Sequence, residues 1–444
     1  MNILKKNPLK TFLTYALPSV VGMLAISSAT IVDGCFVGNN VGAIGLAAIN
    51  ISTPIFSLLF GIALMLSVGA SVLSGKLMGE GDTKSASVIF SKTVLSMAFI
   101  SLVITGLIYF NMSSIINIFD PLKELFELVE LYLTYMLIFI PFLMIGIVFS
   151  YFVKTDSQPY LAFGAMLFSA LINIVLDWVL IAHMGQGIFG AALATGISQA
   201  SLIFILLPHF FTKKATIRFV NPFGSYKVIL KASFNGASEF VNEASVGITA
   251  LVFNYMMMQR FGVDGVAAYA VVNYMLWISL MVSFGVSDSL TPLISKSYGS
   301  KDSQIISKFI RYAFISVILS GLALMVFVLS TPNTLAAIFL DAGENQATTI
   351  VVSFLSFVWP VFLFNGANLV ISAYLTAMHK PIPSATIAIL RSLILPVFLI
   401  LALPILLGDN GLYLAIVLAE VLTLIVALAL FRVYSPKRVM DKNS

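Results

Sequence analysis

Charged side chains, cysteine and histidine are scarce in this sequence. Only 10% of its 444 residues are charged, whereas a soluble globular chain averages about 25%. The single cysteine, Cys35, excludes an intramolecular disulfide and a cysteine-cluster metal site. No Walker, HExxH or nucleophile-elbow motif occurs, so the residues of an ATP-driven pump or a hydrolase are missing. No stretch is polar enough to fold as a separate aqueous domain of ~100 residues.

The sequence consists mainly of long hydrophobic segments. Hydrophobic residues make up 59% of it, and the mean hydropathy is +1.03. Apolar runs of about twenty residues, long enough to cross a hydrocarbon core of ~30 Å, follow one another along the chain. This excludes an outer-membrane barrel, whose strands alternate over about ten residues. The sequence predicts an all-α membrane protein with twelve transmembrane helices, at 15–37, 47–73, 88–110, 131–153, 161–183, 189–211, 233–258, 270–294, 309–330, 350–373, 384–407 and 411–434.

Basic residues predict how these spans are oriented. If the N-terminus is cytoplasmic, all of the 24 Lys and Arg residues except Lys123 and Arg260 lie on the inner side, as the positive-inside rule requires. The stretch with Lys5 and Lys6 resembles the start of a signal peptide, but no small-residue cleavage site follows and Asp33 interrupts the apolar run. We therefore expect a retained first helix and two cytoplasmic termini. The basic segments lack interleaved aromatics, so we expect contact with anionic lipid and not with nucleic acid.

An internal repeat divides the chain. Residues 41–82 align without a gap on 261–302, at an offset of 220 residues. The sequence predicts two pseudo-symmetric six-helix bundles related by an axis along the membrane normal: an N-terminal lobe at 1–211, a cytoplasmic linker at 212–231 and a C-terminal lobe at 232–444. The paired positions are Gly42 with Gly262, Gly45 with Gly265, Gly79 with Gly299, Asp82 with Asp302, Pro159 with Pro381, and Gly190 with Gly411.

Carboxylates inside predicted spans need a reason, because each costs about 2.5–3.5 kcal/mol on insertion scales if ionised at mid-membrane. For Asp288 and Glu239 an alternative is a position near a helix end, in contact with water. Six carboxylates lie inside predicted spans: Asp33, Asp177, Glu239, Glu243, Asp288 and Glu420.

Four oxygen-bearing residues of the first half form a candidate cation-coupling site. Asn173 and Asp177 are four residues apart, on one helix face, Thr195 lies in the next span, and Asp33 lies in the first. Hard oxygen ligands suit Na⁺, and two close carboxyls can also carry a proton. The alternative is a structural hydrogen-bond network between packed helices. The second half has apolar residues at the matching positions, namely Phe253, Leu395, Leu399 and Ile416.

Two further features accompany this site. Glu239 and Glu243 form another pair on one helix face, which makes them candidates for a secondary cation or substrate contact. Asn365 and Asn368 of the tenth span are further candidates for the same contact. Pro18 lies fifteen residues before Asp33, inside the first span. Because a proline within a helix frees a carbonyl and permits bending, Pro18 can couple protonation of Asp33 to the shape of the helix. The alternative for Pro18 is a packing role alone.

Three stretches taken together resemble the multidrug and toxic compound extrusion (MATE) family, in its bacterial multidrug branch. They are "LTYALPSVVGMLAISSATIVDGCFVGNNVGAIGLAA" at the first span, "NIVLDWVLI" at the fifth and "GVSDSLTPLISKSYGS" at the eighth. The resemblance implies two bundles around a V-shaped central chamber, which exchange drug for H⁺ or Na⁺ by alternating access. It also implies the amino-lobe cation site and the bending proline at the residues named above.

The resemblance extends less well to a second coupling site. Another branch of the family uses a glutamate in the seventh helix and an aspartate in the tenth. Glu243 matches the former, but the tenth span has Asn365 or Asn368 in place of the aspartate. This departure favours coupling in the amino lobe.

The predicted function is therefore that of a transporter and not of an enzyme. We expect it to export lipophilic and cationic drugs across the bacterial cytoplasmic (inner) membrane, as a monomer without a cofactor. One alternative is a flippase for lipid-linked precursors, which would need basic residues in the chamber to hold pyrophosphate; only Arg391, near a span end, is a candidate. The other is an intramembrane hydrolase with Asp33 and Asp177 as a catalytic dyad, which would need the two carboxyls within hydrogen-bond distance.

Overall fold

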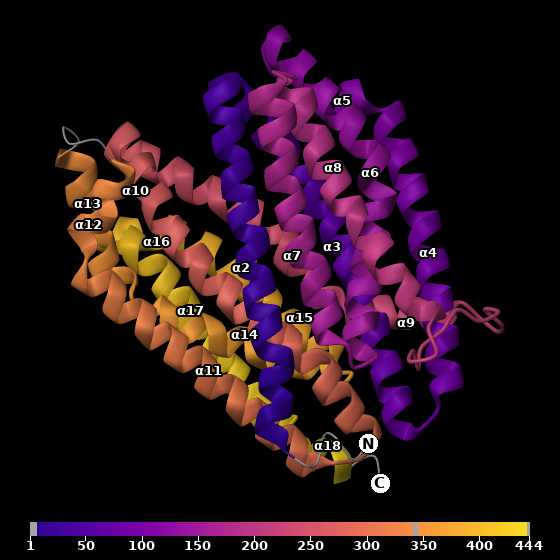
Figure 1. Cartoon of the computed structure of the whole chain (residues 1–444). Helices are drawn as coiled ribbons and strands as arrows, with labels where there is room; N and C mark the ends of the chain where they lie inside the picture. The colour runs from indigo at the N-terminus through magenta and orange to yellow at the C-terminus, as the bar shows by residue number, and fades with distance from the viewer. Residues whose placement is uncertain (1–6, 341–344, 442–444) are drawn as a thin grey trace. The chain divides into compact units, whose positions relative to one another are not determined.

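The computed structural model describes residues 7–340 and 345–441, and these segments are helical almost throughout, without a strand (Figure 1). Lys5, Lys6 and Lys442, used above for the orientation, lie outside the described residues. In chain order the helices are α2 (Pro8–Asn40), α3 (Ala43–Glu80), α4 (Thr83–Phe110), α5 (Met112–Asn117), α6 (Lys123–Thr155), α7 (Pro159–Leu176), η1 (Asp177–His183), α8 (Gly187–Leu206), η2 (Leu207–Phe211), α9 (Lys227–Asn235), α10 (Ala237–Gly299), α11 (Ser303–Ser330), α12 (Pro332–Phe339), α13 (Asn345–Val358), α14 (Val361–Ala377), α15 (Pro381–Ile389), η3 (Leu390–Ile394), α16 (Leu395–Leu407), α17 (Asp409–Val433) and α18 (Pro436–Asp441).

The twelve predicted spans all correspond to helices. Within the described residues, ten helices are long and apolar enough to cross a membrane. One of them, α10, is 63 residues long and contains two predicted spans, which meet at a non-helical residue, Gly262. The predicted tenth span is a pair of helices, Gln346–Val358 and Val361–Ala377, bent by 52°. The all-α membrane fold is thus confirmed.

The internal repeat is visible in the backbone. Gly42, between α2 and α3, has φ 85°, and its counterpart Gly262 has φ 63°. Only glycine adopts such angles without strain, so both halves break their first helix pair at the same place. Asp82 and Asp302 also correspond: each accepts a hydrogen bond from a backbone N–H three residues on, and so caps the helix that follows.

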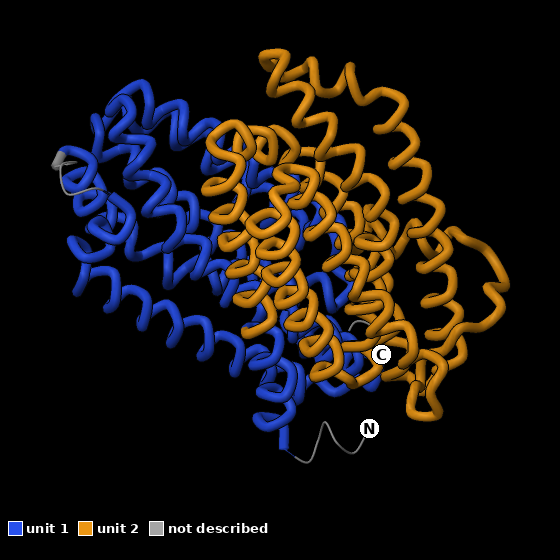
Figure 2. The backbone as a smooth tube through the Cα atoms, turned by 45° about the horizontal axis from the view of Figure 1, so that its top comes forward, with its two compact units in different colours: residues 1–20, 237–444 blue, residues 21–236 orange. Residues whose placement is uncertain are grey.

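Contacts group the chain into two compact units (Figure 2). Residues 21–236, drawn orange as unit 2 in Figure 2, are called the first unit below because they come first along the chain. Residues 237–444 and the described part of 1–20, drawn blue as unit 1, are called the second unit. Helix α2 therefore contributes to both, and it passes from one to the other just after Pro18. The grouping differs from the division at 211 and 231 expected above, which stays a prediction.

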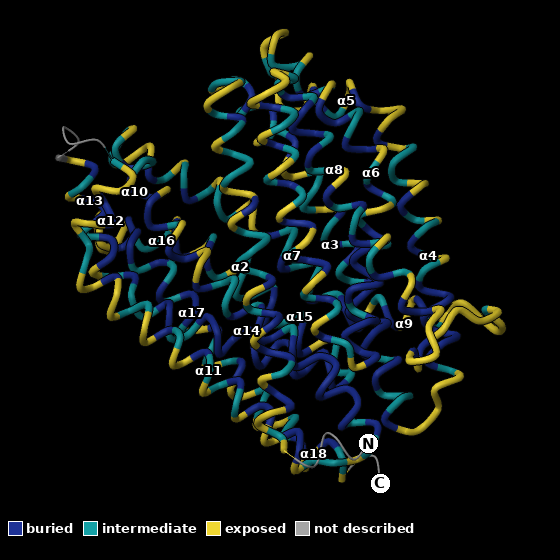
Figure 3. Tube along the Cα trace, in the orientation of Figure 1, coloured by how far each residue is buried: buried dark blue, intermediate teal, exposed yellow. Residues whose placement is uncertain are grey.

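In the first unit, α6 packs on α3, α4 and α8. Its core includes a cluster of phenylalanines in which Phe90 lies against Phe149, Phe152 and Phe210. Two glycines bring α9 onto α3, since a Cβ on Gly236 would lie 2.0 Å from the Met65 carbonyl oxygen and one on Gly69 would lie 1.8 Å from that of Ala232. The segment between η2 and α9 is mostly exposed (Figure 3).

In the second unit, α14 packs on α10, α11 and α17. The first turns of α2 belong here, and Phe12 is buried against Tyr312 of α11. A Cβ on Gly285 of α10 would lie 2.5 Å from Cα of Val20, so the small glycine allows α2 to approach α10 closely. The polar residues discussed next are held by these packed helices.

Candidate functional site

Two carboxyl groups meet inside the first unit. Asp33 comes from α2 and Asp177 from the first turn of η1, and their carboxyls lie within electrostatic range of each other. Asp177 is fully buried, and Asp33 is half-buried with its Oδ1 inaccessible. The helix widens to a π-helical turn at Asp177, a local irregularity that is frequent at functional sites.

The pair has no hydrogen-bond donor of its own among the described residues. Neither oxygen of Asp177 has a hydrogen-bond partner, and neither does Oδ1 of Asp33. Nδ2 of Asn173, one turn before Asp177, is buried and unpartnered as well. A purely structural network would satisfy these atoms, because buried polar groups are normally hydrogen-bonded. A proton or a metal cation between two such carboxyls would relieve the repulsion between them.

Two other residues complete the surroundings of the pair. Thr195 lies on α8 in the same unit, but its side chain makes no hydrogen bond to the carboxyls in the part of the chain that the structure describes. Tyr132 of α6, which the sequence analysis missed, is buried within electrostatic range of both Asp33 and Asp177. Its position in α6 gave no signal in the sequence, because a lone tyrosine in an apolar span is usually part of the core.

The candidate residues of the second half lie in separate places. On α10, Glu239 is within electrostatic range of Glu243 and Asp288, so the predicted pair on one face is present. Asn365 donates a hydrogen bond to Oγ of Ser279 at 3.0 Å. In the described chain no interaction joins Glu243 with either Asn365 or Asn368.

Asn368 belongs to a buried ionic cluster. Its Nδ2 donates to Oε2 of Glu420 at 2.7 Å, and Nε of Arg391 lies 3.1 Å from Oε1 of the same carboxylate. Sequence reasoning noted Glu420 and Arg391 separately and missed that they form a pair. The signal was available, because opposite charges inside neighbouring spans favour pairing.

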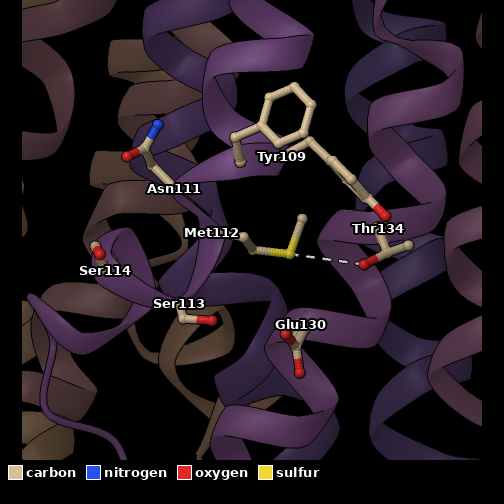
Figure 4. Close-up of a pocket in the computed structure, with 8 residues that line it drawn as sticks. Tyr109, Asn111, Met112, Ser113, Ser114, Glu130 and Thr134 are labelled. Carbon is tan, nitrogen blue, oxygen red and sulfur yellow. Dashed lines mark hydrogen bonds between the residues drawn. The ribbon is translucent and has the colours of Figure 1, made fainter.

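A pocket of about 390 Å³ opens elsewhere in the first unit, between α4, α5 and α6 (Figure 4). Tyr109, Asn111 and Glu130 contribute to its lining, and Oγ1 of Thr134 lies 3.6 Å from the sulfur of Met112. None of the predicted site residues lines it. In residues 7–340 and 345–441, no group of three or more His, Cys, Asp or Glu could hold a metal ion.

A helical protein with this many apolar spans, an internal repeat and buried carboxyl groups within the spans belongs to the class of multi-pass membrane transporters. The profile of one family, MatE, matches the chain twice, at residues 18–179 and 240–401. The two matches follow the internal repeat. The chain belongs to the MatE family, whose members are transporters and not enzymes.

Two comparisons place the chain among known relatives. The multidrug export protein MepA of Staphylococcus saprophyticus is 23% identical over 446 residues, covering 99% of this chain and 96% of that protein. The MepA of a Staphylococcus aureus strain is 24% identical over 447 residues, with 99% and 97% covered. Both relatives thus match this chain over nearly their whole length.

Solved structures share the fold. One is described as the outward-facing conformation of a multidrug resistance MATE family transporter of the MOP superfamily; it has a TM-score of 0.92 and 21% identity, with 99% of this chain and 98% of that chain covered. Another is a MOP superfamily transporter from Pyrococcus furiosus, whose description infers a different function from the reverse polarity of its binding pocket; its TM-score is 0.91, again with 21% identity and the same coverage. The resemblance to the MATE fold is confirmed. The family also sets aside the aspartate-dyad hydrolase.

Proposed function

We propose that this transporter exports lipophilic and cationic drugs in exchange for H⁺ or Na⁺ bound between Asp33 and Asp177. The observation that carries the proposal is the pair of carboxyls within electrostatic range of each other inside the spans, with no donor for the oxygens of Asp177 in the described chain. The names of the relatives support drug export as the activity. The charge distribution of the sequence supports a cytoplasmic membrane location with both termini inside.

Coupling requires that the ion bind one state better than another. Asp33 and Asp177 come from different helices, so a change in the shape of α2 alters the distance between the carboxyls. Pro18 supplies the break in the hydrogen-bond ladder of α2 that such a change needs. Binding of the ion would then favour one shape of α2, and binding of the drug the other.

Glu239 and Glu243 are the proposed contacts for the positive charge of a drug. The half-buried acidic pair offers an uncompensated negative charge to a cation. A lipophilic cation also has an apolar surface, which packs against apolar side chains. Asn365 and Asn368 are less suited, because both donate to other side chains. We propose that the transporter works as a monomer without a cofactor.

The test is efflux of a fluorescent lipophilic cation from proteoliposomes under an imposed proton gradient or an imposed sodium gradient. We expect one gradient to drive export and Asp33→Asn to abolish it. The matched control is Asp120→Asn, because Asp120 is exposed and its left-handed backbone conformation also suits asparagine. If neither gradient moves any cationic dye through folded protein, the drug-exporter proposal fails and a flippase for lipid-linked precursors is the better hypothesis.

A further inference from the structure

A three-residue cluster in the second unit places a full positive charge inside the protein. Arg391 of η3 and Glu420 of α17 are paired at 3.1 Å, and each side chain is only 9% exposed. Asn368 of α14 is fully buried, and its Nδ2 donates both to Oε2 of Glu420 at 2.7 Å and to the Glu420 carbonyl oxygen at 3.0 Å. Both carboxylate oxygens of Glu420 are therefore engaged.

The cluster retains a spare acceptor. Oδ1 of Asn368 is buried and has no hydrogen-bond partner. Together with the two oxygens of Glu420, it gives three oxygen atoms in a site from which water is largely excluded. Carboxylate and amide oxygens are the ligands that a small monovalent cation prefers. In the present arrangement the charge of Glu420 is balanced by the guanidinium and not by an ion.

The first half has no such cluster at the matching positions. At the offsets that align Pro159 with Pro381 and Gly190 with Gly411, all three positions carry uncharged residues. The packing agrees with the alignment. A Cβ on Gly146, which matches Asn368, would lie 3.8 Å from the carbonyl oxygen of Gln199, which matches Glu420. The residues that match Arg391, Glu420 and Asn368 are Ser169, Gln199 and Gly146.

Two groups of buried carboxylates are thus balanced in opposite ways. In the first half, Asp33 and Asp177 lie near each other, with no basic side chain paired to either among the described residues. In the second half, Glu420 is paired with an arginine that belongs to the protein itself. A guanidinium is permanently charged and cannot leave, whereas a bound ion or proton can.

We propose that the Arg391 guanidinium is a built-in counter-cation, which fills a monovalent-cation site made by Glu420 and Asn368. The inference rests on the proposed function for its consequence, which is that the coupling cation is exchanged only in the first half. The Arg391–Glu420 pair keeps its charge balance through the whole transport cycle. Arg391 then determines how many cations are exchanged in each cycle.

Removal of the arginine tests this directly. The background is the double variant Asp33→Asn/Asp177→Asn, in which the first-half site is silent. Within it, Arg391→Met leaves the acceptor oxygens without their cation, and the matched control Arg391→Met/Glu420→Gln removes the charge as well. The measurement is the melting temperature in detergent with NaCl against choline chloride at equal ionic strength and constant pH.

We expect sodium to raise the melting temperature of the Arg391→Met protein by about 2–4 °C, as for a ligand present at ten times its dissociation constant. The background and the Glu420→Gln control should not respond. If Arg391→Met does not fold, Arg391→Gln also leaves the carboxylate charge uncompensated and is measured in the same way. Equal melting temperatures in the two salts would overturn the proposal. Glu420 would then be protonated, or would stay ionised without binding sodium.

The proposed function is judged by a different comparison. The dye efflux of the otherwise unchanged protein and of its Asp33→Asn variant reports on the first half and does not involve Arg391. If that assay fails while sodium still stabilises the Arg391→Met protein, only the proposed function falls. If efflux proceeds as expected but the sodium response is absent, only the role of Arg391 falls.

Discussion

Asp156 is the residue whose loss should most weaken the attachment of residues 212–226 to the first unit. It follows α6 directly, and its carboxylate is fully buried. The carboxylate lies 2.8 Å from Nε2 of His209 in η2, and it accepts hydrogen bonds from the backbone N–H groups of Thr216 at 3.0 Å and Ile217 at 3.3 Å. One side chain thus joins α6 to η2 and to the segment that follows.

Replacing Asp156 with alanine leaves three donors without an acceptor. A hydrogen bond to a charged group contributes about 1.5–3 kcal/mol, and the three bonds share one carboxylate, so their energies do not add. Breaking a buried pair by removing one partner costs about 3–5 kcal/mol. We expect about 3 kcal/mol for opening of the segment at 212–226, because the exposed ends of that segment recover hydrogen bonds to water. Asp156→Asn keeps one acceptor oxygen and should cost less.

Limited trypsin digestion of the purified protein measures this opening. The segment offers Lys213, Lys214 and Arg218 as cleavage sites, and most of it is already exposed (Figure 3). Where opening is fast relative to cleavage, the rate follows the population of the open form. A loss of about 3 kcal/mol therefore predicts cleavage about 100-fold faster, with a lower melting temperature. Wild-type cleavage rates in Asp156→Ala would refute the reasoning, and Asp120→Asn serves as the exposed control because asparagine suits the left-handed backbone there.

Three further predictions concern packing, orientation and pH. Gly236→Ala should lower stability by about 1–3 kcal/mol in a thermal melt, because its Cβ would lie 2.0 Å from the Met65 carbonyl oxygen; an unchanged melting temperature would contradict the close approach of α9 to α3. Lys213→Cys in a Cys35→Ser background should react with a membrane-impermeant maleimide only from the cytoplasmic side, and labelling from outside would reverse the proposed orientation. Hydrogen bonds from the Ser85 side chain and backbone hold the pKa of Asp82 below its usual value. Its stabilising effect is therefore present above the unfolded pKa of about 3.9 and lost as the pH falls through the folded pKa. The melting temperatures of wild type and Asp82→Ala should differ at pH 7 and converge in strong acid.

The sequence by itself determined the membrane class, the spans and the repeat. Apolar runs of about twenty residues admit few structures other than a transmembrane helix, because only a helix satisfies its own backbone hydrogen bonds in hydrocarbon. The repeat follows from glycines such as Gly42 and Gly262, whose left-handed conformation few other residues adopt. Asp33 and Asp177 were also identifiable, since charge inside a span is rare and costly.

Only the tertiary structure decided which of these polar residues interact. Periodicity along one helix gives the face on which a residue lies, but not the partner that faces it from another helix. Packing brings Tyr132 near the carboxyl pair, leaves Thr195 without a hydrogen bond to it, and joins Arg391 to Glu420. The division of α2 between two compact units also depends on contacts made more than 200 residues away along the chain, which no local pattern records.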